Sequence, residues 1–511
     1  MKKIISFVLA IVIAFSLSVS VLAASDKCNC GILPVVYVPG FGEPIYRNPG
    51  TEEEVSVFPP ETDAILKAVP DILKALGAVL VAKDYDAFGT HAINAADKIL
   101  SEAGCNPDGT SKENIGIDPC TLPYEDRHKT AVYSFDNPDI DDESEFRFTY
   151  DWRLDPLDNA ESLNEYIKQV KKFTGHNKII LASHSQGNTV VASYLHLYGS
   201  KGIEKIVFLS PAYQGLSLVG ALLSRTCTVN GKDEAVAEFV MGIMGYEDVT
   251  AQLVGAIISL LNDYGITANL LNFVEKILSE QLDRIFDDYL IDVMGTMPGV
   301  WSFVPDEYYE AAKKATFKGL DKYDELEKKV DFYHYNVQCK LTRLIDKAKR
   351  NGTAVVSALG YDISSIPVTS EKENHSDFLI DTEYMSIGAN VAKIGETLGD
   401  NYKQKKTSCG HNHVSPDRII DASTGAYPEH TWYIKGNPHN GFVEPYLEFL
   451  TWLILFDGQP TVRSSKKYPQ FMEIKDNQLV PVEGAREKDE RMDEVIIFDS
   501  LVTLIKESFR K

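Results

Sequence analysis

The sequence predicts an α/β fold, in which a mostly parallel central sheet is covered by helices on both faces and is interrupted by a large helical cap. Apolar, β-branched runs alternate with helical patterns over residues 32–212, which is typical of parallel strands joined by helices. The alternation then stops, and residues 216–345 have almost entirely helical patterns with apolar stripes. Strand patterns return at 353–362 and 429–436, so the helical segment is inserted within one sheet.

The elements of the first half follow in order. Strands are expected in the segments ILPVVYVPGFG (32–42), TAVYSF (130–135), EFRFTYDW (145–152), HNKIILASHS (176–185) and IEKIVFLSPA (203–212). Helical patterns occupy residues 60–104, and a polar loop follows to residue 130. The helix after EFRFTYDW is clearly amphipathic, and Asn159 or Ser162 is its expected N-cap.

The second half completes the sheet and defines the expected organisation. A helix is expected over GFVEPYLEFLTWLILF, and the tail from Ser464 onward is charged and weakly patterned. The expected units are a signal peptide (1–24), a first core part (25–215, with an insertion at 51–130), a helical cap (216–345), a second core part (346–463) and a C-terminal extension (464–511).

The amino terminus has the features of a secretory signal peptide. Lys2 and Lys3 precede an apolar run, and small residues at Ala23 and Ala24 offer a cleavage site. The alternative is an uncleaved membrane anchor, because the run is nearly long enough to span a bilayer. We favour cleavage and export, and we expect no transmembrane span in the mature chain.

Seven cysteines remain after cleavage, so at least one has no partner within the chain. In an exported protein, a disulfide between Cys105 and Cys120 would close the polar loop between them, and the sequence does not determine which cysteines pair.

The overall charge excludes one class of partner. The chain has 74 acidic and 51 basic side chains, a net charge of −23. Such a surface repels a phosphate backbone, so nucleic acid is not an expected partner. The hydrophobic content of 44% is enough for a substantial core and excludes general disorder.

Ser185 has the local sequence of a nucleophile. It lies between a buried strand and a helix, at the tip of a sharp turn that exposes a serine hydroxyl at the sheet edge. Small residues must flank such a turn, and Ser183 and Gly187 meet this requirement, although glycine is usual at the first position. His184 is adjacent in the chain and is expected to pack rather than to act as the base.

The oxyanion formed by attack on an ester requires backbone N–H donors. Gln186 lies at the start of the helix after the nucleophile, and its backbone amide is one expected donor. The N-terminus of this helix carries the positive end of the helix dipole, which stabilises negative charge. The turn VPGFG follows the first strand, and the amide of Phe41 in this turn is the second expected donor.

The nucleophile, the acid and the base are expected in the chain order Ser, Asp, His. His439 lies after the strand EHTWYIKG and before the last helix, so it is the expected base. Asp377 is the preferred acid, ahead of Asp381 and then Asp362. A carboxylate in this role fixes the tautomer of the imidazole and stabilises its charged form.

A short run, CGHNH, offers Cys409, His411 and His413 as metal ligands. A fourth ligand with a telling spacing is missing, so we expect no metal and no cofactor, and we expect these residues to be solvated.

Several of these stretches together resemble the lecithin:cholesterol acyltransferase family of α/β-hydrolases. FTYDWRLDP (148–156) is similar to the Tyr-Asp-Trp-Arg signature of that family, and PVVYVPGFG and ASHSQGN to its oxyanion and nucleophile segments. TMPGVWSFVP (296–305) resembles the element that closes its cap, and HSDFLIDTEYMS its acid loop, with Phe378 where the family has glycine.

The resemblance implies a secreted serine acylhydrolase or O-acyltransferase that acts on lipids, with Ser185, Asp377 and His439 as its triad. It also implies that Tyr150, Asp151, Trp152 and Arg153 are structural. Water or an alcohol is the acyl acceptor, and the sequence does not choose between them. A small-ester carboxylesterase, a peptidase and a non-catalytic binding protein on the same fold are the alternatives.

Overall fold

The computed structural model describes residues 33–78, 82–118, 145–229, 276, 280–364, 368–369, 374–406 and 410–483. The expected signal peptide, the strand at 130–135 and most of the cap between residues 230 and 279 lie outside these ranges.

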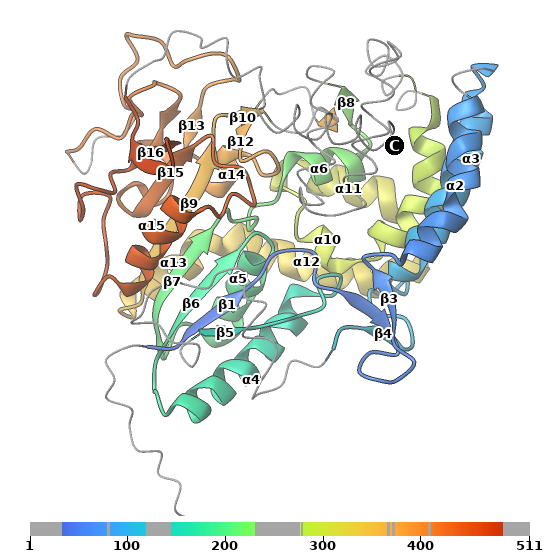
Figure 1. Ribbon diagram of the computed structural model, residues 1–511, viewed down its shortest axis with the longest axis horizontal. Helices are drawn as coiled ribbons and strands as arrows, with labels where there is room; N and C mark the ends of the chain where they lie inside the picture. The colour runs from blue at the N-terminus through green and yellow to red at the C-terminus, as the bar shows by residue number, and fades with distance from the viewer. Residues whose placement is uncertain are drawn as a thin grey trace, which may run out of the picture.

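An eight-stranded sheet forms the centre of the molecule (Figure 1), in the order β17-β16-β15-β9-β7-β6-β1-β5. All neighbouring pairs are parallel except β16 and β17. The strands are β1 (Val35–Val38), β5 (Glu145–Arg147), β6 (Ile179–His184), β7 (Ile203–Leu209), β9 (Ala354–Tyr361), β15 (Thr431–Lys435), β16 (Phe471–Lys475) and β17 (Gln478–Pro481). The predicted α/β-hydrolase architecture, with a mostly parallel sheet between helices, is confirmed.

Both faces of the sheet are buried, which explains why its strands are almost continuously apolar. Val36 and Val38 of β1 pack in a cluster with helices α4 (Pro156–Thr174), α5 (Gly187–Tyr198) and α13 (Leu341–Arg350). Val35 and Tyr37 point the other way, into a cluster with helix α15 (Glu444–Leu455). This alternation with period two places helices on both faces of the sheet.

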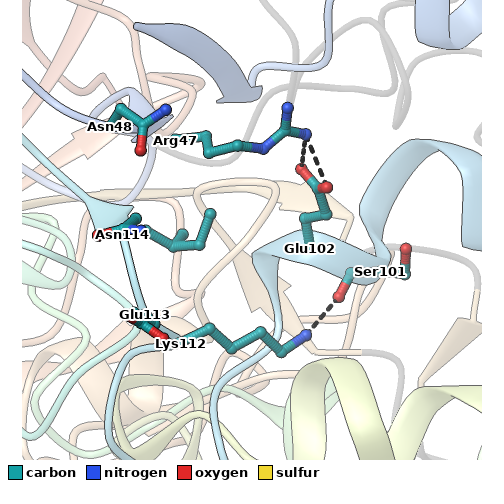
Figure 2. A pocket seen from close by; sticks show the side chains of 8 residues that line it. Arg47, Asn48, Ser101, Glu102, Lys112, Glu113 and Asn114 are labelled. Atoms are coloured by element: carbon teal, nitrogen blue, oxygen red, sulfur yellow. Dashed lines mark hydrogen bonds and ion pairs between the residues drawn. The ribbon is translucent and has the colours of Figure 1, made fainter. Parts of the chain in front are cut away.

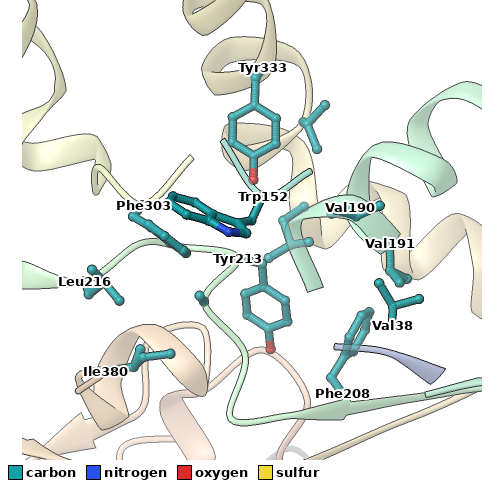
Figure 3. Packing of buried hydrophobic residues seen from close by; sticks show 14 of the residues in the cluster. Val38, Trp152, Val190, Val191, Phe208, Tyr213, Leu216, Phe303, Tyr333 and Ile380 are labelled. Carbon is teal, nitrogen blue, oxygen red and sulfur yellow. The ribbon is translucent and has the colours of Figure 1, made fainter. Parts of the chain in front are cut away.

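The helical cap packs onto the first of these clusters. Its described helices are α6 (Ser217–Ser224), the π-helix η5 (Phe286–Gly295), α10 (Pro298–Trp301), α11 (Asp306–Phe317), η6 (Asp321–Tyr323), α12 (Asp324–Asn336) and η7 (Gln338–Lys340). Figure 3 shows Leu216 and Phe303 from this segment in one buried cluster with Trp152 and with Val38 of the sheet. Core and cap therefore share one continuous apolar interior.

The insertion at 51–130 contributes a helical hairpin, α2 (Thr62–Gly77) and α3 (Tyr85–Leu100), which lies at the far right of Figure 1. The turn η2 (Ser101–Ala103) follows the hairpin. The remaining elements are short: the three-stranded sheet β3-β2-β4 (Val55–Phe58, Ile45–Arg47, Ile115–Gly116), the pairs β8–β11 (Thr228–Val229, Val368–Thr369), β10–β12 (Ile363–Ser364, His375–Ser376) and β13–β14 (Asn390–Val391, Ile420–Asp421), helix α14 (Thr382–Met385), and the turns η8 (Ala422–Thr424) and η9 (Pro428–His430). None of the helices in the described ranges combines the length and apolar composition that crossing a membrane requires.

Three local expectations need correction. Helix α4 begins at Pro156 and its N-cap is Asp155, which accepts from the amide of Leu157, so the N-cap is neither Asn159 nor Ser162. The C-terminal extension is not merely a charged tail, because it provides β16 and β17 at one edge of the main sheet. Cys105 is a buried free thiol, so no disulfide closes the polar loop at this residue.

Candidate active site

Ser185, Asp377 and His439 all lie beyond the carboxyl ends of strands that are close together in the central sheet. Ser185 directly follows β6, Asp377 lies in the connection after β9, and His439 follows β15. The sheet order β15-β9-β7-β6 brings these three ends to one edge, which is where open α/β sheets bind ligands.

The turn at Ser185 is strained and closely packed. Ser185 has φ +51°, a left-handed conformation that costs a non-glycine residue about 1–2 kcal/mol. A Cβ at Gly187 would lie 2.3 Å from the carbonyl oxygen of Val38, so only glycine fits there. The unusual Ser183 is accommodated because its hydroxyl donates to Asn188 Oδ1 at 2.8 Å, and the amide of the same asparagine donates to the carbonyl of Ser185 at 2.8 Å.

Asp377 and His439 form a buried pair beside this turn. His439 Nδ1 lies 2.7 Å from Asp377 Oδ2, and the Asp377 side chain is fully buried. The other carboxylate oxygen accepts from the amides of Leu379 and Ile380 at 3.1 and 2.8 Å. A backbone bond from the amide of His439 to the carbonyl of Asp377, 2.7 Å, fixes the two loops together. The carboxylate is thus positioned to hold the imidazole with a proton on Nδ1.

His184 supports the histidine loop. Its Nε2 lies 3.0 Å from the carbonyl oxygen of His439, and the two ring centroids are 4.7 Å apart. Burial, followed by the proximity of His439, lowers the pKa of His184 well below its usual value, so its ring is neutral. It is therefore a positioning residue, and its partner was not apparent from the sequence.

The turn after β1 lies directly against the serine. A Cβ at Gly40 would lie 2.7 Å from Ser185 Cβ, so the glycine permits this close approach. The amides of Phe41 and Gln186 lie next in the chain to these two residues. Neither amide donates to another group in the described part of the chain, so both remain available for an oxyanion.

The Tyr-Asp-Trp-Arg segment connects the surroundings of the site. Tyr150 donates to the carbonyl of Pro39 at 2.9 Å, which holds the turn after β1. The carbonyl of Trp152 accepts from Gln186 Nε2 at 2.7 Å, and a Cβ at Gly299 would lie 1.9 Å from this carbonyl oxygen. The role expected for the segment was structural, and each of these contacts joins the core to the turn, to helix α5 or to the cap.

Arg153 has no exposed surface and forms the charged part of this network. Its guanidinium pairs with both carboxylate oxygens of Asp151 and donates to the carbonyl of Ala103 and the hydroxyl of Ser111. These partners anchor the 51–130 insertion to the core. A buried charge requires this degree of pairing.

The two alternative acids have other partners. Asp381 accepts from the amide and hydroxyl of Ser217 at 2.9 and 2.7 Å, and so joins the start of α6 to the core. Asp362 lies 3.3 Å from both His375 Nδ1 and Lys435 Nζ.

His411 and His413 lie near the opposite end of β15, close to Glu429 in η9. His411 Nδ1 and His413 Nε2 lie 2.9 and 3.1 Å from the same oxygen, Glu429 Oε1, while Arg463 pairs with the other oxygen at 2.9 Å. These histidines form a hydrogen-bonded cluster around Glu429 instead of the solvated loop that the sequence suggested, and His413 is buried. Cys409 lies outside the described residues.

A surface pocket between β2 and the loop before β4 (Figure 2) contains none of the predicted site residues. Within it, Arg47 pairs with Glu102, and Lys112 donates to the carbonyl of Ser101 at 2.7 Å.

Comparisons with known proteins were made by sequence and by structure. A family model described as lecithin:cholesterol acyltransferase matches residues 141–242, which include the Tyr-Asp-Trp-Arg segment and Ser185. The search of curated proteins finds no match. Among solved structures, a chain from "The crystal structure of Tle4-Tli4 complex" is similar with 12% identity and a TM-score of 0.28, over 80% of this chain and 95% of that chain. At that TM-score the likeness supports no argument, and the fold assignment depends on the sheet order and connections.

The matched segment includes the turn at Ser185 and the Tyr-Asp-Trp-Arg segment, both of which belong to the mostly parallel central sheet and its connections. This segment of the chain is therefore similar to the lecithin:cholesterol acyltransferase family, and the likeness supports an enzyme of the esterase or acyltransferase type.

Proposed function

We propose that the protein is a secreted serine acylhydrolase or O-acyltransferase that acts on lipid esters through Ser185, His439 and Asp377. One observation carries the proposal: a buried Asp377 carboxylate lies 2.7 Å from His439 Nδ1, beside a serine held at a strained strand-to-helix turn. A nucleophile, a base and a residue that orients the base are the three groups that acyl transfer requires.

The mechanism proceeds through an acyl-enzyme. Ser185 Oγ attacks the ester carbonyl carbon while His439 Nε2 takes the hydroxyl proton, and Asp377 stabilises the imidazolium. The amides of Gln186 and Phe41 donate to the oxyanion. When the tetrahedral intermediate collapses, the bond to the leaving alcohol breaks and His439 gives that alcohol its proton. Water or an acceptor alcohol then attacks the acyl-enzyme, loses its proton to His439, and the proton returns to Ser185.

Two features support a lipid substrate. The family whose model matches the chain is described by acyl transfer from lecithin to cholesterol. Two described cap residues, Leu216 and Phe303, are buried in the apolar cluster that contains Trp152, and Phe41 of the turn after β1 packs on Trp152 with ring centroids 4.2 Å apart. An apolar wall suits a long acyl chain.

Chain length tests the substrate class. We expect kcat/KM to be higher for long-chain or aggregated lipid esters than for two-carbon acyl esters. A preference for the short soluble esters would indicate a carboxylesterase, and cleavage of peptides alone would indicate a peptidase.

Export is part of the proposal and depends on the amino-terminal segment, whose charged start, apolar run and Ala23–Ala24 exit are typical of a cleaved signal peptide. Amino-terminal sequencing of protein recovered from the medium would identify the cleavage site. Recovery only as an uncleaved, membrane-bound chain would contradict export.

Labelling with a fluorophosphonate tests the nucleophile. We expect the wild-type protein to be labelled, and Ser185→Ala to lose the label and at least about 10³-fold in activity, since triad members act as a unit. Ser193→Ala is the matched control, because this buried serine of α5 donates only to the carbonyl of Thr189, 2.9 Å away. Undiminished labelling of Ser185→Ala would overturn the assignment, and an unlabelled wild-type protein would favour a non-catalytic binding protein.

A further inference from the structure

Three side chains of different chemistry converge in the cap, where α11 begins and α12 ends. Asp306 is the first residue of α11, His334 lies in the last turn of α12, and Cys339 lies in η7. Asp306 Oδ1 and His334 Nε2 are 3.0 Å apart, and Cys339 Sγ lies 3.4 Å from this nitrogen and 3.5 Å from this oxygen. The three atoms thus form a nearly equilateral triangle.

The size of this triangle matches one face of a metal coordination tetrahedron. With Zn–N and Zn–O distances of about 2.0–2.1 Å and a Zn–S distance of about 2.3 Å, the ligand atoms of a tetrahedral site lie roughly 3.3–3.6 Å apart. Two of the three separations fall in this range, and the third is shorter by a few tenths of an ångström. Small rotations of the exposed Asp306 side chain are enough to lengthen it.

The environment of His334 points its free electron pair at the other two groups. Gln338 Nε2 donates to the carbonyl of Ser302 at 3.3 Å, so Gln338 Oε1 faces His334 Nδ1, at 2.7 Å. Since an amide oxygen only accepts, Nδ1 carries a proton, and in the neutral form of the ring Nε2 has a free electron pair. The ring also stacks on Tyr309, with centroids 3.6 Å apart and an interplanar angle of 5°.

With the neutral ring, this arrangement leaves two acceptors facing one another. The Nε2 lone pair points toward a carboxylate oxygen, and the single thiol proton of Cys339 can serve only one of them. A metal ion at the centre accepts electron pairs from all three groups. A histidine that donates its other N–H to a carbonyl oxygen is the usual outer-shell arrangement for a metal ligand.

The cluster is accessible. The Asp306 side chain is 82% exposed and Cys339 is exposed, whereas His334 is buried. Asp306 and Cys339 line a surface pocket of about 400 Å³ that also includes Glu307, Glu383 and Tyr384. A metal ion and its solvent ligand can therefore enter from this side.

We propose that Asp306, His334 and Cys339 bind one Zn²⁺ ion, with the fourth position open to solvent. Sulfur, imidazole nitrogen and carboxylate oxygen together suit zinc, and three protein ligands with an open position make a complete site. Cys339 binds as the thiolate, and its proton passes to solvent. The ion links α11 to the end of α12, and so stabilises the cap.

The second histidine cluster provides an internal contrast. His411, His413 and Glu429 also bring three potential ligand atoms together. There, however, the guanidinium of Arg463 lies 2.7 Å from His411 Nε2 and 2.9 Å from Glu429 Oε2, so a cation already neutralises the carboxylate. Among the described residues around Asp306, His334 and Cys339, no arginine contacts the three ligand atoms.

Cobalt titration of the reduced, metal-free protein tests the proposal, because tetrahedral Co²⁺ bound by a thiolate has visible d–d bands and a near-ultraviolet sulfur-to-cobalt charge-transfer band. We expect one Co²⁺ per chain with both bands, displacement of Co²⁺ by Zn²⁺, and a higher thermal midpoint in Zn²⁺. Cys339→Ser should lose the charge-transfer band, and Gln338→Ala should weaken binding by about 10–100-fold.

Two controls make the test specific. Cys227→Ser removes a free cysteine outside the cluster, and His413→Asn disables the second histidine cluster, so both should leave the spectrum and the stoichiometry unchanged. Since Cys339 and Asp306 are exposed, their variants are expected to fold. The absence of both bands from the wild-type protein, or a charge-transfer band that persists in Cys339→Ser, would overturn the proposal.

Discussion

Strand β15 has a histidine–carboxylate cluster at each end. The two clusters differ in whether a histidine ring nitrogen is left without a hydrogen-bond partner in the described part of the chain. Beyond its carboxyl end, His439 Nδ1 is held by Asp377, and in the described part of the chain Nε2 has no hydrogen-bond partner. Before its amino end, both nitrogens of His413 are engaged, by Gln470 Oε1 at 2.7 Å and Glu429 Oε1 at 3.1 Å.

The carboxylates differ in the same sense. Asp377 is fully buried and pairs with one histidine, whereas Glu429 is shared by His411, His413 and Arg463. Burial raises the pKa of Glu429, but the hydrogen bonds from His411 and Arg463 outweigh it and hold the pKa below its usual value. A histidine–carboxylate pair is thus suited to proton transfer only when one ring nitrogen stays open toward a substrate. The amino-end cluster, in which every ring nitrogen has a partner, is suited to stability.

The largest effect is expected from replacing the histidine beyond the carboxyl end of β15. His439→Ala should reduce kcat/KM by about 10³-fold or more, as deeply as loss of the serine. His411→Gln and His413→Gln should retain most of the activity, because neither ring lies at the carboxyl edge. Steady-state rates on a long-chain ester, with circular dichroism to confirm folding, provide the measurement. An inactive, folded His413→Gln beside an active His439→Ala would reverse the comparison.

Replacing the two carboxylates should produce a smaller difference in kcat between the two clusters. Asp377→Asn keeps the shape of the side chain but no longer fixes the imidazole tautomer, so kcat should fall on the order of 10³–10⁴-fold. Glu429→Gln should lower the thermal midpoint and leave kcat/KM close to the wild-type value. We would measure kcat and melting temperature for both variants. Equal losses of kcat would show that the two carboxylates do not differ in role.

The sequence predicted these strand ends because their strands are strongly patterned. β6, β9 and β15 are buried apolar runs, and the positions of Ser185 and His439 follow from where those runs stop. The carboxyl edge could therefore be predicted without knowledge of distances. Asp377 required more, because several aspartates follow β9 and only the structure shows which one contacts the histidine.

Other features depended on signals that pattern reasoning overlooked. β16 and β17 are short and partly charged, but Asp476 and Asn477 between them have φ +51° and +57°, typical of a type I′ hairpin turn, and the Asp-Asn pair was a usable signal. Pro156 at the first turn similarly indicated Asp155 as the N-cap. Phe378 has φ +87°, a backbone conformation that favours glycine.

Contacts between segments distant in sequence had no local signal. The cluster of Asp306, His334 and Cys339 and the bond between His184 and His439 each depend on how loops and helices meet after folding. Periodicity reports which face of one element is buried, and it does not report which residue of another element lies opposite.

A smaller effect is expected at His184, which supports the carboxyl-end cluster without titrating. His184→Phe keeps the aromatic packing on Phe442, whose ring centroid is 5.0 Å away, and removes the hydrogen bond to the His439 carbonyl. Loss of one such bond is worth about 1 kcal/mol, which corresponds to roughly a 5-fold fall in kcat. KM and the shape of the pH–rate profile should not change. A fall as deep as that of His439→Ala would identify His184 as the base instead.

The last effect is on stability and leaves the site untouched, and it tests whether a partner, and not burial alone, determines how a carboxylate behaves. Asp155 is buried, and its side chain accepts from a backbone amide, that of Leu157, at 2.9 Å. Burial raises its pKa to about 6, with Asp158 and Glu161 adding to the rise and the amide of Leu157 opposing it. Because the folded-state pKa lies above the unfolded value, the folded protein binds more protons between pH 4 and 6. The free energy of unfolding therefore falls as pH rises through this window, and the loss is complete above it.

Asp155→Asn keeps the capping oxygen and removes the charge. The variant should be more stable than wild type at pH 8, by about 1–3 kcal/mol, and nearly equal at pH 4. Thermal midpoints of both proteins at the two pH values measure this difference. A less stable variant at pH 8 would mean that the charged cap favours folding through the helix dipole more than burial opposes it.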